Sequence, residues 1–187
     1  FLLEVAEDVP FVAGVVGWVD FAAPDCADVI ARLAANPLLV GLRPMVQDIA
    51  NDNWLIDTTL APAFRAIIAH KLVFDALVLP RHLSRLARVV DRHPDLHVVI
   101  DHAAKPPIRS AAADLQAWRS DLAVLADGPM VCCKLSGLVT EASRDWTVAT
   151  LRPYAEHVIG TFAPRRVIWG SDWPVVELAG GYDRWHD

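Results

Sequence analysis

The chain carries the sequence RVIWGSDWP at residues 166–174, and this stretch decides the fold. An apolar run, Arg166–Trp169, meets a Gly-Ser break that is followed at once by Asp172 between two indoles. A carboxylate beside so much apolar surface is costly unless it is paired or its pKa is raised for a purpose. Three other apolar runs end in the same way, in Arg43, in Asp101 with His102, and in Lys134. This repetition indicates a catalytic face at the ends of several strands.

Six apolar runs are strand-like, and their nearly continuous apolar character predicts a parallel sheet buried on both faces. They cover Val12–Val19, Leu38–Arg43, Val73–Leu79, His97–Asp101, Met130–Lys134 and Arg166–Trp169. Helical patterns lie between them, at Asp25–Ala35, Leu60–His70, Leu83–Arg92, Leu115–Ala126 and Leu151–Phe162. Asp25 is the expected N-cap of the first of these helices.

Alternating strands and helices leave two architectures open, a doubly wound sheet and a (β/α)8 barrel. No strand is followed by a glycine-rich nucleotide-binding fingerprint. Polar residues gather at the strand carboxyl ends, where barrel enzymes collect their catalytic groups, and this favours the barrel.

Composition predicts one domain over residues 1–187, because 54% of the residues are hydrophobic and 21% are charged. The net charge of −6 and the absence of a basic block argue against nucleic acid and anionic membranes as partners. No apolar stretch approaches the roughly 18 residues of a membrane span. Cys26, Cys132 and Cys133 suit no disulfide framework, so we expect them in the core of a cytoplasmic protein.

Four strand-end side chains are the candidates for chemistry: Arg43, His102, Lys134 and Asp172. In neighbouring parallel strands they converge on one pocket. A carboxylate or a histidine that activates water, with two cations that hold an anionic or hydroxylated substrate, suits hydrolysis of an ester or a lactone.

Each candidate also has a structural interpretation. Asp172 suits a helix cap or a loop, His102 suits a satisfied structural group, Arg43 can pair with Asp48, and Lys134 suits a structural ion pair. Asp101 is expected to orient or cap rather than react. The remaining six histidines lack ligand spacing and receive no site role.

Several stretches together give the chain a family resemblance. They are residues 14–20 (GVVGWVD), 40–48 (VGLRPMVQD), 100–107 (IDHAAKPP), 133–141 (CKLSGLVTE) and 169–174 (WGSDWP). In this order and spacing they resemble the amidohydrolase-related family of metal-dependent hydrolases, in particular its sugar-lactone and pyrone-dicarboxylate lactonase branch (L-fuconolactonase-like).

The resemblance implies a (β/α)8 barrel in which Asp172 is the general base or a metal-side ligand. It places His102 in the active centre, as a ligand if a divalent metal such as zinc is bound. It implies that Arg43 and Lys134 contact the substrate. We add Gln47, from a polar loop, and Trp173 as further substrate-binding candidates.

One departure from the family is large, since the chain has no His-x-His pair. The six strands correspond to the third through eighth of the barrel, so we expect an internal piece of a longer protein that is inactive or unstable by itself. The ends fit this expectation: Phe1–Ala6 reads as the tail of a helix, and residues 182–187 as the start of one.

The sequence therefore predicts a cytoplasmic lactonase that opens a sugar-derived or dicarboxylate lactone with water activated by Asp172. Its partner is a small-molecule lactone, and a homo-oligomer is compatible with the sequence. Two alternatives stay open. One is a metal-dependent decarboxylase or amidohydrolase of the same superfamily, and the other is an inactive fragment that lacks the His-x-His strand.

Overall fold

Six parallel strands form one sheet in the computed structural model, which describes residues 1–109 and 112–187. The strands are β1 (Val15–Gly17), β2 (Leu39–Leu42), β3 (Val73–Ala76), β4 (Val98–Ile100), β5 (Val131–Leu135) and β6 (Val167–Trp169). The α-helices of the described residues are α1 (Leu2–Glu7), α2 (Cys26–Ala34), α3 (Ala61–Ala69), α4 (Leu83–Arg92), α5 (Ala112–Ala126), α6 (Leu138–Glu141), α7 (Val148–Phe162) and α8 (Gly181–His186).

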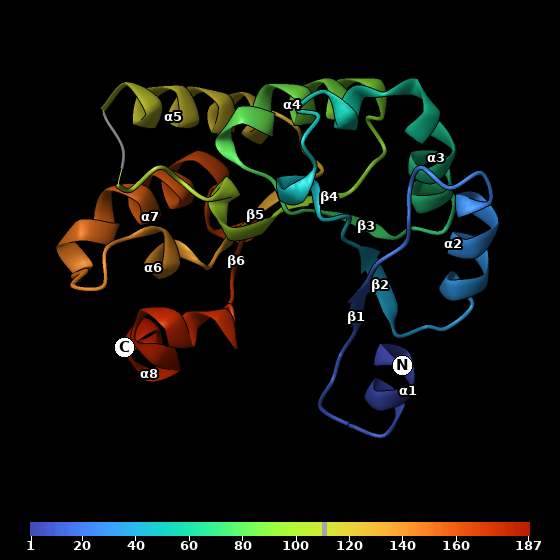
Figure 1. Cartoon of the computed structure of the whole chain (residues 1–187), viewed down its shortest axis with the longest axis horizontal. Coiled ribbons are helices and arrows are strands. Elements are labelled where there is room, and N and C mark those ends of the chain that lie inside the picture. Colours follow the sequence, from blue (N-terminus) through green and yellow to red (C-terminus); the bar gives the residue numbers. More distant parts are fainter. Residues whose placement is uncertain (110–111) are drawn as a thin grey trace.

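The strand order decides between the two architectures. The strands lie side by side in chain order, β1 to β6, each parallel to the next. A doubly wound sheet reverses its order at a switch point, whereas a barrel keeps it. Helices α2, α3, α4, α5 and α7 follow one another in an arc around the sheet (Figure 1). The predicted barrel fold is confirmed, and in the described residues it is an open, curled sheet of six strands.

The prediction that every strand is buried on both faces is wrong for the two outer strands, β1 and β6. The central strand β3 is largely buried, but β1 is half-buried throughout. In β6, Ile168 is 42% exposed and Trp169 is 47% exposed. In the described sheet β1 and β6 each pair with one neighbour, so their apolar side chains have fewer partners than those of the inner strands.

The five predicted helices are present, with bounds that differ by a few residues. Asp25 occupies the N-cap position of α2, but its side chain makes no cap hydrogen bond. Helix α7 begins at Val148, before the predicted start at Leu151. The Thr147 side chain caps it by accepting a hydrogen bond from the backbone N–H of Thr150. None of the described helices combines the length and the apolar character needed to cross a bilayer.

The core lies between the sheet and the arc of helices. Phe64 of α3 meets Phe74 of β3 edge-on, with ring centroids 5.3 Å apart, and Phe21 contacts both rings. Trp118 of α5 is fully buried, and its Nε1 donates to the carbonyl of Ala103 at 2.8 Å. This bond ties the helix layer to the turn that follows β4. Cys26 and Cys133 are buried and Cys132 is half-buried.

Candidate active site

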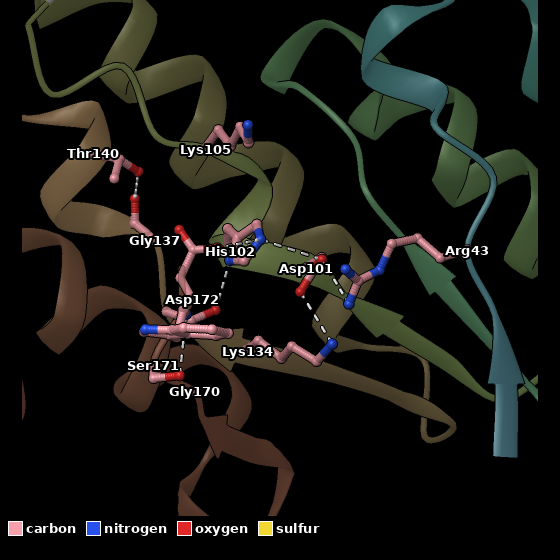
Figure 2. A network of polar contacts seen from close by, with 12 residues as sticks. Arg43, Asp101, His102, Lys105, Lys134, Gly137, Thr140, Gly170, Ser171 and Asp172 are labelled. Carbon is pink, nitrogen blue, oxygen red and sulfur yellow. Dashed lines mark hydrogen bonds and ion pairs between the residues drawn. The ribbon is translucent and has the colours of Figure 1, made fainter. Parts of the chain in front are cut away.

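Four strands deliver polar side chains to one pocket. Arg43 follows β2, His102 follows β4, Lys134 lies near the end of β5, and Asp172 follows β6 after a two-residue break. Because the strands are parallel and adjacent, their carboxyl ends share one edge of the sheet. A pocket of about 220 Å³ at this edge is lined by all four side chains and by Asp101, Ser136 and residues 169–173. Figure 2 shows the side chains of His102 and Asp172 close together, with Lys134 and Arg43 around Asp101.

Asp75, in the middle of β3, is a charged residue that the sequence analysis did not single out. Its side chain is 2% exposed, and its Oδ2 lies 2.9 Å from Arg43 Nη2 and 2.7 Å from Lys134 Nζ. Ion pairing is what makes a carboxylate tolerable at this depth. The sequence signal that could have found Asp75 is an acid inside the otherwise apolar run Val73–Leu79.

Asp101 forms the second half of the same network. Its side chain is fully buried, with oxygens 3.1 Å from Arg43 Nη2 and 3.1 Å from Lys134 Nζ. Two carboxylates and two cations are thus interlinked across three strands. Arg43 pairs with these buried acids and not with Asp48. Asp101 contacts both cations, and its orienting role stays a prediction.

His102 and Asp172 form the second part of the site. His102 Nε2 lies 3.4 Å from Asp172 Oδ1 and 3.4 Å from Asp101 Oδ2, and its Nδ1 lies 2.8 Å from Ser136 Oγ. Burial lowers the pKa of His102, although the neighbouring carboxylates oppose this, so the imidazole is neutral at neutral pH. Burial raises the pKa of Asp172, although His102 opposes this. A carboxylate with a raised pKa is a stronger base than an ordinary aspartate.

The backbone around these residues is held in an uncommon conformation. His102, Ala103, Ala104 and Lys105 all have φ between 50° and 56°, and Asp172 has φ 60°. The left-handed region costs a residue with a side chain roughly 1–2 kcal/mol. Such conformations persist where the surroundings impose them, and they cluster at functional sites. Here the Trp118 indole supports the turn through the Ala103 carbonyl.

Of the two further substrate-binding candidates, Trp173 lines the pocket and Gln47 does not. Trp173 lines the pocket and is 69% exposed. Gln47 is not among the lining residues of this pocket. Its backbone N–H donates to the carbonyl of Leu77, and its carbonyl accepts from Arg81 on the neighbouring loop. The structure therefore groups Trp173 with the strand-end residues and leaves Gln47 outside.

The described residues do not fit a complete zinc site. His102 and Asp172 are close enough to share an ion, but Asp101, the nearest further carboxylate, is engaged by two cations. Catalytic zinc takes three protein ligands. In residues 1–109 and 112–187 no three His, Cys, Asp or Glu side chains are grouped so that they could hold a metal.

Comparison with known proteins identifies relatives along the whole chain. The amidohydrolase family model matches residues 1–187. The chain is 50% identical over 182 residues to the L-fucono-1,5-lactonase of Burkholderia ambifaria. This match covers 97% of this chain and 62% of that protein. It is 38% identical to the L-fucono-1,5-lactonase of Burkholderia multivorans, over 98% of this chain and 64% of that protein.

A solved structure agrees with these relatives. The crystal structure of an amidohydrolase from Burkholderia multivorans with bound zinc superimposes with a TM-score of 0.90 at 39% identity. The match covers 98% of this chain and 66% of that one, so the chain spans slightly less than two thirds of the relatives it matches. A family match over its entire length shows that this chain belongs to the amidohydrolase family.

Proposed function

We propose that the protein is a hydrolase that opens a neutral, sugar-derived lactone with water activated by Asp172. The observation that carries the proposal is the pairing of Asp172 Oδ1 with His102 Nε2 in the strand-end pocket, 3.4 Å apart. The relatives named as L-fucono-1,5-lactonases support the reaction class and the type of substrate.

In the proposed reaction the Asp172 carboxylate accepts a proton from water, and the hydroxide adds to the lactone carbonyl. The resulting oxyanion needs hydrogen-bond donors in place before the reaction starts. Lys134 Nζ has three hydrogens. It donates one to Asp75 Oδ2 and lies 3.1 Å from Asp101 Oδ1, so at least one hydrogen is left for the substrate. The ring C–O bond then breaks, and the leaving oxygen takes the proton from Asp172. The product is a hydroxy acid.

The charges of the site favour a neutral lactone over a dicarboxylate lactone. Arg43 and Lys134 are already neutralised by Asp75 and Asp101, and Asp172 adds a further negative charge. The nearby Lys105 lies 4.0 Å from Glu141, which offsets its charge. A pocket that is on balance negative repels an anionic substrate and favours release of the carboxylate product.

A metal-dependent decarboxylase or amidohydrolase is the less favoured alternative, because the relatives at 50% and 38% identity are named as lactonases. The other alternative, an inactive fragment, concerns this chain alone, which spans 62% of the first relative. We also propose that residues 1–187 belong to one barrel domain, and that the protein works in a reducing cytoplasm, which its free cysteines support.

A lactone panel, assayed on the full-length protein, tests the proposal. Initial rates of acid release are measured by a pH indicator for neutral aldonolactones and for a dicarboxylate lactone of equal ring size. The proposal expects kcat/KM to be highest for a neutral lactone. Hydrolysis of the dicarboxylate lactone alone contradicts the substrate class, and hydrolysis of neither contradicts the lactonase assignment.

A further inference from the structure

We propose that Asp75 is a positioning residue, whose buried carboxylate holds the Lys134 ammonium at the floor of the pocket with an N–H left for the substrate. The inference deepens the proposed function and rests on it for its kinetic consequence. Its structural content, the hold of Asp75 on Lys134, is testable without any substrate.

Two carboxylates face the Lys134 ammonium, and they act on it differently. Asp75 Oδ2 accepts a hydrogen bond from Lys134 Nζ at 2.7 Å and another from Arg43 Nη2 at 2.9 Å. Asp101 lies 3.1 Å from each of these two nitrogens, but neither of its oxygens accepts a hydrogen bond from the described residues. Asp101 therefore contributes charge, whereas Asp75 sets the direction of the ammonium.

The carboxylate of Asp75 is itself held in place by the sheet. Strand β3 pairs with β2 on one side and with β4 on the other, where Asp75 lies opposite Val99. The Asp75 side chain is 2% exposed, so it has little room to move. A carboxylate fixed in the interior of the sheet is a suitable anchor for a long side chain that comes from β5, two strands away.

Lys134 needs an anchor because a lysine is a point charge on a flexible four-carbon stem. Its side chain lines the pocket that also contains Asp172. An ammonium released from Asp75 is attracted to the Asp172 carboxylate, and a pair between them would occupy the base. In the described residues Asp172 forms its ion pair with His102 and not with Lys134. Asp75 thus keeps the cation and the base of the pocket apart.

The consequence for catalysis is the position of one hydrogen-bond donor. An ammonium bound to Asp75 keeps an N–H for the oxyanion that forms when water adds to the lactone carbonyl. Loss of one such donor costs about 10²–10³-fold in kcat, and a donor misplaced by about 1 Å costs about 10²-fold. We expect Asp75→Asn to lower kcat about 10- to 100-fold. KM should change little, because the oxyanion is absent from the bound substrate.

A double-mutant cycle in the full-length protein separates this role from a merely structural one. Lys134→Met removes the ammonium at similar side-chain length and is combined with Asp75→Asn. The proposal expects Asp75→Asn to lower kcat about 10- to 100-fold alone, but less than about 3-fold in the Lys134→Met background. The same factor in both backgrounds overturns the proposal. If Asp75→Asn does not fold, the same cycle is run with Asp75→Glu, which keeps the charge but displaces the carboxylate.

The hold on Lys134 is tested by acetylation with acetic anhydride, followed by mass spectrometry in the unmodified full-length protein. Lys105 is the internal control, since its side chain is 24% exposed and its Nζ lies 4.0 Å from Glu141. The Lys134 side chain is similarly exposed, at 21%, but donates to Asp75. The proposal expects Lys134 to react about 10-fold more slowly, as one hydrogen bond between charged groups implies. Equal rates overturn it. Because no lactone is used, this failure is distinguishable from a failure of the lactonase assignment.

Discussion

Lys134 Nζ of β5 lies 2.7 Å from Asp75 Oδ2 of β3, so this ion pair reaches across the intervening strand β4. Asp101, at the end of β4, lies between them and contacts the same ammonium at 3.1 Å. The floor of the pocket is thus a charge network that links three strands, and it depends on a residue in the interior of the sheet.

Replacement of Asp75 by Asn should destabilise the fold, because Arg43 and Lys134 then share a single buried carboxylate. Loss of one partner of a fully buried pair costs about 3–5 kcal/mol, and the partial exposure of both cations reduces this to about 2 kcal/mol. Urea unfolding measures the change. Asp48→Asn, in the loop after β2, is the matched control and should lie within about 0.5 kcal/mol of the unmodified protein. Equal effects of the two substitutions would contradict the network.

The rate should depend on pH through Asp172. The reaction needs the carboxylate, and burial raises its pKa above the ordinary value of 3.8. Activity is therefore complete above the raised pKa and is lost as the pH falls through it, at higher pH than an exposed aspartate would give. A kcat profile corrected for spontaneous lactone hydrolysis reports this limb. A rate that rises as the pH falls would rule out a carboxylate base.

Stability should also fall in mild acid. Burial is the main cause that lowers the pKa of four histidines, which are His82, His93, His102 and His157. The unfolded chain therefore binds more protons than the folded one just below pH 6.5. The contribution of these four neutral histidines to the free energy of unfolding is complete above pH 6.5. It is lost as the pH falls through their pKa values in the folded protein. His82→Asn should make the melting temperature less dependent on pH. The same pH dependence in this variant would contradict the role of His82.

Trp118→Phe tests the support of the left-handed turn. The change removes the donor to the Ala103 carbonyl, a bond of 2.8 Å in the core. An unsatisfied buried carbonyl costs about 1–3 kcal/mol. We expect a loss of stability in this range together with a lower kcat, because the turn positions His102. Wild-type stability and kcat would show that the turn does not need this bond.

The strand-helix alternation and the strand-end residues could be predicted from the sequence, since both are local patterns. The observed β3 ends at Ala76, before the predicted end at Leu79, because apolar residues also fill the loop that follows. Asp75 was missed because its partners are 32 and 59 residues away, and no local pattern shows such a pairing. Gln47 does not line the pocket, and its backbone is held by Leu77 and Arg81, which are likewise distant in sequence.

The most direct test of the account is the kcat of Asp172→Asn on the best neutral lactone of the panel. A positioned general base contributes about 10²–10⁴-fold to the rate. The account predicts a loss of kcat in that range with little change in KM, while circular dichroism and melting temperature confirm that the variant is folded. A folded variant with unchanged kcat would contradict the assignment of Asp172 as the base.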